Sequence, residues 1–529
     1  MVKVKKLQPG MKVRSKLKKK NMGRIGTIMT VYSELKDGKI TKRAQITWDD
    51  NIAITETITL TSVEEYRKPD ELNEMKMPGE IRLPNATWRK IEPLEKIQLQ
   101  KPRDHNQFAV NWPHLLPVTP VNVFRFLFPN VENIVEETQK KLPSHNFSQS
   151  RFWRWLGVTL SVGRNISEYW KDGMGKAKFK MSFKSYKAIM RHLVFSKCSD
   201  EDTTKDKWSR VRQFINSFNI NRRSTIYPCC FCVDESSCKW RGRENRTTRN
   251  IRGCPAVTKS KTKPEGVACQ LNTVCDGCMS VLLGIEICEG EGATNEYDDV
   301  MNKGSAIVMR MVKPWKNENR LVVADSRFAS VELAACLRRW GMHFIGCVKT
   351  CTSMFPIQNL RDDWDPQFAG ESVGYDAIIG GTPLIACAWS DFIKKKKKSG
   401  ERYVKKIKRT FISTCFSMED GMPHVKKKTK ENEETQYNLI KRPKIVGQYY
   451  RNSGSVDFHN HMRQGGLQLE KKILTKDFFK RLFLTIVGMI EVDSYIVYKH
   501  LILQQRHQGL GDVSSHRHFT NNLIDELLK

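Results

Sequence analysis

An α/β fold built on a mostly parallel sheet, with helices on both of its faces, is predicted from three features of the sequence. A short apolar run at 320–325, a helical pattern at 331–340 and a second apolar run at 343–348 follow one another in the order of a β-α-β unit. Two β-like runs at 268–276 and 279–288, joined at Asp276-Gly277, predict a β-hairpin. The segments on both flanks carry apolar residues at spacings of three and four, which predicts helices.

The N-terminal segment has a different pattern. Residues 1–70 contain several short apolar runs separated by Gly turns, which predicts a small β domain. It resembles an SH3-like barrel of the KOW or Tudor kind, and a plain β-meander is the alternative. Residues 71–116 are rich in Pro and poor in apolar runs, so we expect a linker there.

The rest of the chain divides by its periodicity. Residues 117–265 predict the first part of a helical domain, with helical spacing at 124–128, 131–141, 151–160, 182–193 and 205–218. The α/β core is expected at 266–349, where Ser330 is a candidate cap for the helix that Gly341 ends. A β-rich insertion with a Lys-rich loop is expected at 350–440, with strands at 382–389 and 409–416. The core resumes at 441–462, the second helical part at 463–510, and a C-terminal tail at 511–529.

Charge is the strongest feature of the composition. The 529 residues include 90 Lys and Arg against 57 Asp and Glu, which gives a formal net charge of +33. Such an excess favours a polyanionic partner, because each phosphate contact releases condensed counterions. We interpret it as a nucleic-acid footprint, and a merely solvated surface is the alternative. Hydrophobic residues make up 39% of the chain, which argues against wholesale disorder.

The sequence also indicates a compartment. No secretory signal is visible, and the most apolar run, 482–497, is interrupted by Glu491 and Asp493, so no membrane span is expected. The 15 Cys are therefore expected to be reduced thiols or metal ligands. Basic clusters at 16–20 and 394–398 are compatible with nuclear import, and we expect the nucleus.

Two Asp residues end predicted strands. Asp276 closes the run at 268–276, and Asp325 closes the run at 320–325. Ligands gather at the carboxyl ends of strands in open α/β sheets, and two neighbouring carboxylates need a cation to offset their repulsion. This pattern favours a two-metal phosphoryl-transfer site with Mg²⁺, which prefers oxygen ligands. The alternative is that each Asp only forms a turn.

A third candidate lies near the C-terminus. Ser453 and Gly454 suit a helix start, and a helix beginning there places Asp457, Asn460 and His461 on one face. A carboxylate in the first helical turn is also favoured by the helix dipole, which is the ordinary alternative explanation of Asp457.

The Cys and His residues offer a second kind of site. Cys229-x-x-Cys232 and Cys275-x-x-Cys278 have the spacing of zinc ligands, and Cys230, Cys238 and Cys254 lie nearby in the sequence. The second pair brackets Asp276 on a strand, where inward Cys fill a core, so a structural zinc site is not expected. For His459 and His461 we expect a solvated or DNA-facing role.

Several segments, in order, resemble the piggyBac transposases and the proteins derived from these transposable elements. The resemblance covers about 117–505 and rests on Asp234-Glu-Ser-Ser-Cys-Lys-Trp-Arg-Gly-Arg243, Lys263-Pro-Glu-Gly-Val267, Thr273-Val-Cys-Asp276, Ala324-Asp-Ser-Arg-Phe-Ala-Ser330, Trp389-Ser-Asp391 with Phe411-Ile-Ser-Thr414, Tyr449-Tyr450 with Gly454-Ser-Val-Asp457, and Lys480-Arg-Leu-Phe483 with Ser494-Tyr-Ile-Val-Tyr498. Each motif alone is weak, and their shared order gives the resemblance its weight.

The resemblance implies a fold and a function. The core would be RNase H-like, as in retroviral integrases, and the flanking helices would form a dimerisation and DNA-binding domain. The catalytic and metal-binding residues would be Asp276, Asp325 and Asp457, with Asn460 as a further ligand. They would hold two Mg²⁺ or Mn²⁺ ions for DNA cleavage and strand transfer at TTAA sites. The implied partners are double-stranded DNA and a second copy of the chain, with DNA contacts at Arg241, Arg243, Lys394, Lys395, Lys396, Lys397 and Lys398.

The sequence departs from the family at three places. Many members have an acidic residue where this chain has Asn460, many end in a Cys-rich zinc-binding domain that the tail from His500 lacks, and the N-terminal β unit is not a general family feature. These departures keep an alternative open, a domesticated and catalytically silent DNA or chromatin binder. A nucleic-acid or chromatin ligand for 1–70 would also fit an RNA-binding protein, which explains the charge but not the ordered motifs.

Overall fold

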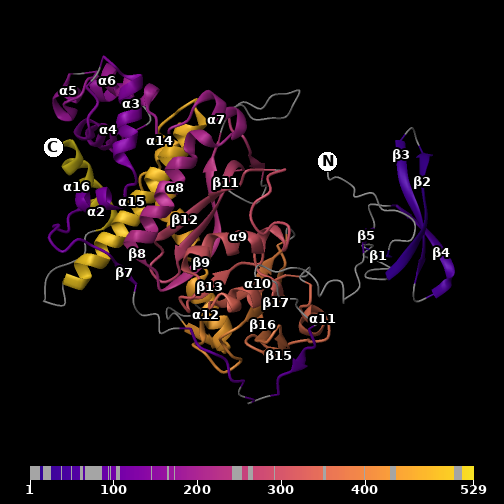
Figure 1. Cartoon of the computed structure of the whole chain (residues 1–529). Helices are drawn as coiled ribbons and strands as arrows, with labels where there is room; N and C mark the ends of the chain where they lie inside the picture. The colour runs from indigo at the N-terminus through magenta and orange to yellow at the C-terminus, as the bar shows by residue number, and fades with distance from the viewer. Residues whose placement is uncertain are drawn as a thin grey trace. The chain divides into compact units, whose positions relative to one another are not determined.

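The chain forms two units in a computed structural model, residues 1–86 and 87–529, and each is described by itself (Figure 1). In the first unit the structure describes the backbone of the strands at 12–15, 25–36, 39–48, 51–59 and 63–65. From residue 86 onward it describes every residue except 93–94, 96, 103–107, 145, 164–165, 172, 241–252, 260–265, 291, 350–352, 398–399, 429–435 and 506–514.

The first unit is a five-stranded antiparallel sheet. Its strands are β1 (Lys12–Ser15), β2 (Ile25–Lys36), β3 (Lys39–Trp48), β4 (Asn51–Thr59) and β5 (Val63–Glu65), in the order β4-β3-β2-β1-β5. The last strand returns to pair with the first. The short strands expected from the Gly turns are therefore confirmed, and closure into an SH3-like barrel stays a prediction.

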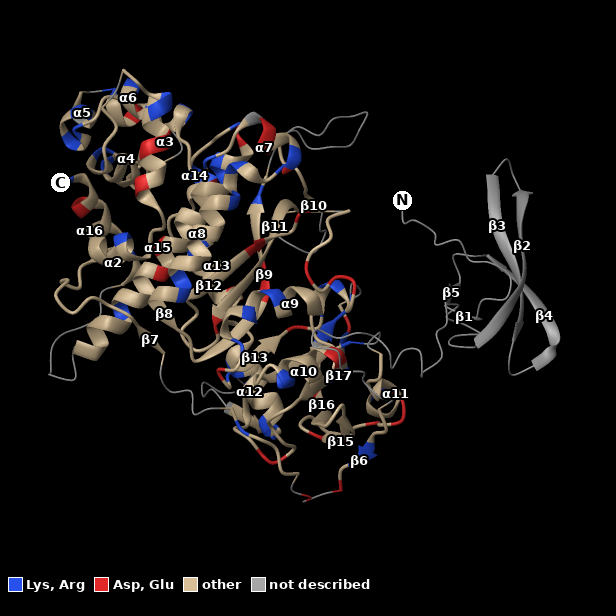
Figure 2. Cartoon of the chain, in the orientation of Figure 1, with Lys and Arg blue, Asp and Glu red and all other residues tan. Residues whose placement is uncertain are grey.

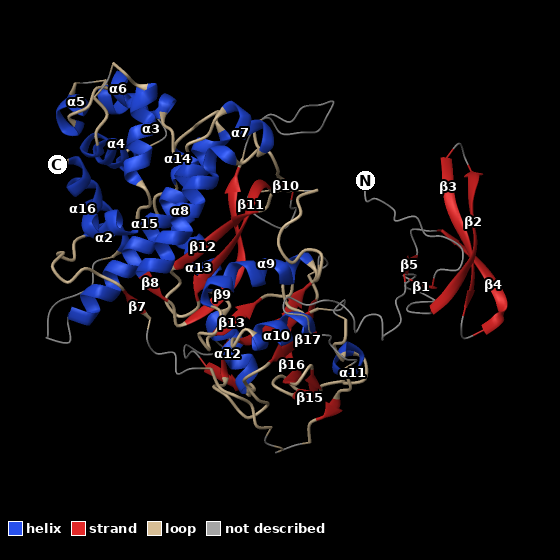
Figure 3. Ribbon diagram, viewed as in Figure 1, coloured by secondary structure: helices blue, strands red, loops and turns tan. Residues whose placement is uncertain are grey.

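A ten-stranded mixed sheet organises the second unit (Figure 3). Its order is β10-β11-β9-β13-β14-β17-β16-β15-β6, and β12 pairs with β11 on the side that β10 also occupies. The strands are β6 (Arg89–Lys90), β9 (Cys230–Lys239), β10 (Thr258–Lys259), β11 (Val267–Asp276), β12 (Leu282–Ile287), β13 (Leu321–Ala324), β14 (His343–Val348), β15 (Ser372–Ile379), β16 (Thr382–Lys396) and β17 (Arg402–Ser413). Two small separate pairs are β7 (Ala109–Val110) with β8 (Ile226–Tyr227) and β18 (His424–Lys428) with β19 (Gln436–Ile440).

The expected β-α-β unit is confirmed. Strands β13 and β14 are parallel and are joined by α10 (Val331–Arg339), whose first turn is capped by the Ser330 hydroxyl, 3.0 Å from the Leu333 amide. Strand β9 is parallel to β13, and the other pairings in this sheet are antiparallel. The expected hairpin is also confirmed, because β11 and β12 are antiparallel neighbours.

Helices cover both faces of the central strands. On one face lie α9 (Lys303–Val312) and α10, and there the ring of Phe231 on β9 lies 5.0 Å from that of Trp315, centroid to centroid. On the other face lie α12 (Lys444–Asn452) and α13 (Ser455–Gly465), and α12 packs Ile445 and Tyr449 against Val323 in one buried core. Short helical turns at η3 (Lys313–Trp315) and α11 (Ile357–Arg361) complete this part.

The remaining helices form a second layer beside the sheet. They are α2 (Pro120–Leu127), α3 (Val131–Lys141), α4 (Gln149–Ser161), η2 (Ile166–Trp170), α5 (Met174–Phe179), α6 (Phe183–His192), α7 (Asp200–Lys205), α8 (Ser209–Thr225), α14 (Leu469–Lys472), α15 (Phe478–Gln505) and α16 (His516–Leu528). A fully buried ion pair, with Arg222 of α8 2.9 Å from Asp493 of α15, joins the two sequence halves of this layer. Asp493 also accepts the amide of Leu282 in β12, at 2.8 Å, so it fastens the helices to the sheet. Among the described residues, no helix has both the length and the apolar character to span a membrane.

The structure differs from the sequence expectations in four places. The expectation of a mostly parallel sheet is wrong, because only the β9–β13 and β13–β14 pairings of the main sheet are parallel, and the strands added on either side pair antiparallel and include the hairpins β11–β12 and β16–β17. The basic segment after residue 394 is no simple loop, because β16 and β17 stay paired as far as Lys396 and Arg402, and β17 pairs with β14 in the main sheet. The expected tail contains α16, which buries Phe519 and Leu523. The stretch at 230–239, expected within the helical segment 117–265, is β9.

Candidate active site

The central strand β9 brings an acidic residue next to Asp325. In the parallel register of β9 and β13, Val233 pairs with Ala324, and the next residue along each strand is Asp234 and Asp325. Neighbouring strands lie about 5 Å apart, and paired residues point to the same face. Both carboxylates therefore leave the sheet side by side, on the face that α12 and α13 cover.

Helix α13 runs along β9 on that face. The backbone of Ser455 and Val456 lies against the Cys232 thiol, and the Asn460 side chain donates to the Glu235 carbonyl at 3.3 Å. Asp457 stands between these two contacts, in the first turn of the helix, and its side chain is exposed. Burial raises the pKa of the Cys232 thiol to about 12, and the charges of both Asp234 and Asp457 act in the same direction.

The direction of Asp457 follows from the helix. His459 is buried, and its Nε2 lies 3.1 Å from Asp493 Oδ1 on α15, on the β12 side of the sheet. Two residues of an α-helix differ by about 200° in direction, so Asp457 points away from α15 and toward the β13 side. Asp325 lies on that side, directly after the last residue of β13. The structure thus gathers Asp234, Asp325 and Asp457 around one end of β9 and β13.

A cation stands among these carboxylates. Arg327, two residues after Asp325, forms an ion pair with Glu235. Burial lowers the pKa of the Arg327 guanidinium, and the charge of Asp234 opposes that shift. The Asp325 carboxylate accepts the Arg327 amide at 2.8 Å, which fixes the turn after β13.

Asp276 lies elsewhere. It pairs with Phe231 on β9, three residues before Asp234, which corresponds to about 10 Å along a strand. Its carboxylate is fully buried and accepts the amides of Cys229 (2.7 Å), Cys278 (3.0 Å) and Met279 (2.6 Å). Burial raises the pKa of Asp276. The structure therefore places Asp325 beside Asp234 at the end of β9 and β13, with α13 carrying Asp457 along the same face, and leaves Asp276 inside a turn.

Strand direction explains this difference. Two strand-end Asp residues meet at one edge of a sheet only when their strands are parallel. Strand β11 is antiparallel to β9, whereas β13 is parallel to it. The end of β11 therefore lies near the start of β9, and the end of β13 lies further along it.

Asp234 was missed because β9 was not expected as a strand. The signal was present in the sequence, since the apolar run at 229–233 is followed at once by Asp234 and Glu235. Such a run after a helical stretch is the pattern of a short buried strand that ends in polar residues.

The residues of this cluster fit a hard divalent cation. Carboxylate oxygens are the ligands such ions prefer, and Asp234, Asp325 and Asp457 supply three carboxylates. The buried Oδ1 atom of Asn460 has no protein hydrogen-bond partner among the described residues, so it is a fourth oxygen without another role. The guanidinium of Arg327 competes with a bound cation for the same negative charge.

The basic residues named from the sequence fall into two groups. Arg241 and Arg243 lie outside the described residues, as does Lys398. Lys394, Lys395 and Lys396 end β16, and Lys395, Lys396 and Lys397 are exposed, with Lys397 paired to Glu401 at 2.8 Å. Figure 2 shows Lys and Arg both around α6 and α7 and beside β17. Basic side chains are thus presented by the helical layer and by the sheet.

Comparison with known proteins now defines the class. The model of the transposase IS4 family matches residues 119–495, more than half of the chain, so the chain belongs to this family of transposases. Membership implies a nuclease that depends on a divalent metal ion. The match includes Asp234, Asp325 and Asp457.

A solved structure gives the nearer likeness. The chain is similar to piggyBac transposase in a cryo-EM structure of its synaptic complex with hairpin DNA, with a TM-score of 0.60 and 17% sequence identity over 80% of this chain and 82% of that one. At this identity the likeness shows the fold, a large mixed sheet flanked by helices, as in piggyBac transposase. No curated protein matches the chain.

Proposed function

We propose that this chain is a piggyBac-like DNA transposase, or a protein derived from one. It cleaves and joins DNA phosphodiester bonds, with Asp234, Asp325 and Asp457 as its catalytic residues. The observation that carries the proposal is the register of β9 and β13, which sets Asp234 beside Asp325 on the face where α13 presents Asp457. The strand order β12-β11-β9-β13-β14, with β9 central, supports an RNase H-like core. In this proposal Asp234 has the role of first catalytic Asp, which the resemblance of the sequence motifs had given to Asp276.

The roles of the residues follow from their positions. Asp234, Asp325 and Asp457 would hold two divalent cations, either Mg²⁺ or Mn²⁺. Asn460 Oδ1 would be a neutral ligand. The bound ions supply charge stabilisation to the attacking and leaving oxygens of an in-line displacement. The protein positions the scissile phosphate against this edge of the sheet, and that positioning is the main source of rate in phosphoryl transfer.

The substrate is double-stranded DNA. The net charge of +33 supports a polyanion, and the neighbouring piggyBac structure holds hairpin DNA. Lysines along the ends of β16 and β17 would contact phosphates, which position DNA without reading its sequence. The proposal has three further parts, which rest on the resemblance of the sequence motifs to those of piggyBac transposases. They are cleavage and strand transfer at TTAA sites, a homodimeric assembly and a nuclear location.

The test is nicking of supercoiled plasmid by the full chain in Mg²⁺ or Mn²⁺. Wild type is expected to nick only with metal, and Asp234→Asn and Asp325→Asn are expected to abolish nicking while plasmid binding persists. Asp299→Asn is the matched control, because Asp299 is exposed and lies outside the cluster. Full nicking by Asp234→Asn would remove this residue from the site and sink the proposed triad.

A second function is favoured by Arg327 and Asn460. The ion pair of Arg327 with Glu235 and the neutral side chain at 460 both lower the negative charge available to a metal ion. These features support a silent DNA or chromatin binder, and the first unit could then carry a chromatin or nucleic-acid ligand. If wild type binds plasmid without nicking it, Asn460→Asp tests whether one added carboxylate restores cleavage. Binding without nicking in both proteins establishes the silent binder.

A further inference from the structure

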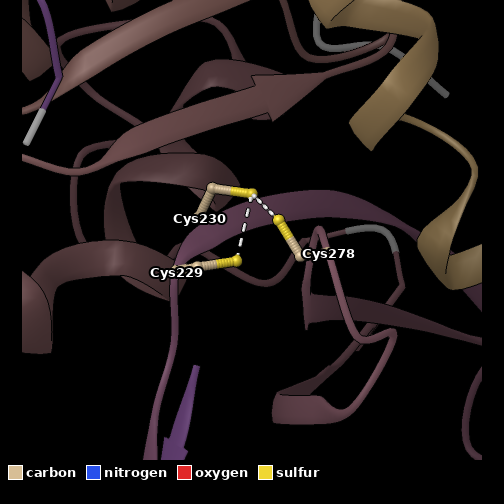
Figure 4. A group of neighbouring side chains, drawn as sticks. All are labelled: Cys229, Cys230 and Cys278. Atoms are coloured by element: carbon tan, nitrogen blue, oxygen red, sulfur yellow. Dashed lines mark hydrogen bonds between the residues drawn. The ribbon is translucent and has the colours of Figure 1, made fainter. Parts of the chain in front are cut away.

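Three thiols meet near the start of β9. Cys229 and Cys230 lie at the start of β9, and Cys278 lies in the turn between β11 and β12 (Figure 4). The Cys230 sulfur is 3.8 Å from that of Cys229 and 3.8 Å from that of Cys278, and all three sulfurs lie within 4.8 Å of one another. This grouping differs from the two Cys-x-x-Cys pairs that the sequence spacing indicates, because Cys232 and Cys275 are not members of it.

The separations match a metal centre. A tetrahedral zinc ion with Zn–S bonds of about 2.3 Å places its sulfur ligands about 3.8 Å apart. A disulfide would need sulfurs about 2.05 Å apart, so the three Cys are not joined to one another by disulfides. The Cys230 sulfur therefore stands at the spacing of zinc ligands from each of the other two sulfurs.

An oxygen atom completes the group. Asn452 Oδ1, at the end of α12, lies 3.5 Å from the Cys230 sulfur and 3.9 Å from the Cys278 sulfur. Asn452 is 3% exposed, and its amide nitrogen donates to the Gln448 carbonyl at 2.9 Å, which turns the oxygen toward the thiols. A buried polar oxygen in contact with two of the three sulfurs is an observation independent of the Cys spacing.

The surroundings favour a soft cation. Three thiol groups at one point suit zinc, which prefers thiolate ligands where Mg²⁺ does not. Cys278 is exposed and lines a cavity of about 1100 Å³, which gives an ion a route of entry.

We propose that Cys229, Cys230 and Cys278 bind one zinc ion, with Asn452 Oδ1 in the fourth position. The ion would tie β9, the β11–β12 turn and the junction of α12 with α13 together. Gly277 already donates its amide to the Cys230 carbonyl at 3.0 Å, and Ser455 of α13 donates to the Gly277 carbonyl at 2.7 Å. The site would thus be structural, and it would hold the elements that carry Asp234 and Asp457 in register.

Local backbone packing agrees with this role. A Cβ atom at Gly277 would lie 2.6 Å from the Cys230 sulfur, closer than real Cβ contacts allow. Only glycine lets the turn approach β9 closely enough for Cys278 to join the other two thiols.

The test measures metal directly and needs no DNA cleavage. The full chain is expressed with zinc, purified under reducing conditions and assayed for metal content by mass spectrometry, beside Cys278→Ser, Cys278→Ala and Cys198→Ser. About one zinc per chain is expected in wild type and in the Cys198→Ser control, whose Cys lies outside the cluster. Both Cys278 variants are expected to lose the ion.

Cobalt substitution gives a second readout. The Co²⁺ form of wild type should show sulfur-to-metal charge transfer and the intense visible bands of a tetrahedral centre, and Asn452→Asp should shift those bands without emptying the site. A chelator should lower the Tm of wild type and leave that of Cys278→Ser unchanged. Wild type without zinc or cobalt, or Cys278→Ser with a full zinc content, would overturn the proposal. A Cys230–Cys278 disulfide on mild oxidation in a metal-free wild type would instead assign the thiols to redox chemistry. None of these outcomes depends on nicking activity.

Discussion

The turn between β11 and β12 is held by the Asp276 carboxylate, and replacing Asp276 with Ala should destabilise the protein. The carboxylate accepts three backbone amides, those of Cys229, Cys278 and Met279. Asp276→Ala leaves these donors without their acceptor, and each unsatisfied buried donor costs about 1–3 kcal/mol. Burial of the charged carboxylate, which raises its pKa, offsets part of that loss. The net expectation is a loss of about 3 kcal/mol or more in the free energy of unfolding.

Two further substitutions sharpen the expectation. Asp276→Asn keeps an oxygen for the amides of Cys278 and Met279 and brings an NH₂ group against the Cys229 amide, so it should cost about 1–3 kcal/mol. Asp234→Ala should cost less than about 1 kcal/mol, because Asp234 is partly exposed and its removal also relieves repulsion from Asp325. The expected order of stability is wild type and Asp234→Ala first, then Asp276→Asn, then Asp276→Ala.

The assay is urea unfolding followed by Trp fluorescence, with reductant and chelator present so that bound metal makes no contribution. The same preparations are then tested for nicking. If Asp276→Ala unfolds at the wild-type urea concentration, the three amides do not depend on its carboxylate and our reasoning fails. If Asp276→Asn keeps wild-type stability and loses nicking, Asp276 is catalytic, as the sequence comparison implied.

Three other predictions have defined outcomes. Arg222→Met leaves the buried Asp493 without its Arg partner and should lower stability by about 3–5 kcal/mol. Arg223→Met, at the next residue and outside the ion pairs of the described residues, should change the Tm little. The double variant Lys395→Gln, Lys396→Gln should weaken DNA binding to the same degree for all DNA sequences. The slope of the logarithm of the binding constant against the logarithm of salt concentration should fall by about 1 for each phosphate that these lysines neutralise in wild type. An unchanged slope would mean that the two lysines contact solvent and not DNA. Burial raises the pKa of the Cys238 thiol to about 12 from about 9, so the native state keeps a proton that the unfolded state loses, and stability falls as pH rises above about 9. Cys238→Ala should remove about 1 kcal/mol of the loss between pH 8 and 10, measured by urea unfolding at both values.

Local sequence signals predicted the elements of the core but only part of its arrangement. The unit β13-α10-β14 could be predicted because its apolar runs, its Ser330 cap and its terminal Gly341 are close in sequence. Strand β9 was missed because only the two-residue strand β8 separates it from the long helix α8, and because it pairs with β11 and β13, which lie further along the chain. Its central position is a property of tertiary pairing, which no local pattern contains.

The candidate site shows the same limit. Asp325 and Asp457 could be predicted, since one ends a buried strand and the other starts a helix. The third member could not be chosen correctly without the direction of β11. Asp276 and Asp234 both accompany an apolar run, and only the antiparallel pairing of β11 with β9 shows that Asp276 turns into the protein.

Two side chains near the candidate site, Arg327 and Asn460, change its charge balance and therefore its expected affinity for a metal ion. Carboxylates that share one end of a sheet repel one another, and a divalent cation relieves that repulsion most strongly where no other cation is present. Here Arg327 already neutralises part of the charge through Glu235 and Asp234, and Asn460 contributes an oxygen without a charge. Metal affinity should therefore be lower than at a site with four carboxylates and no guanidinium. DNA can change this balance, because a phosphate that takes the Arg327 guanidinium frees the carboxylates for metal. Metal binding and DNA binding would then be coupled through one side chain, and metal affinity measured with DNA bound should exceed that of the free protein.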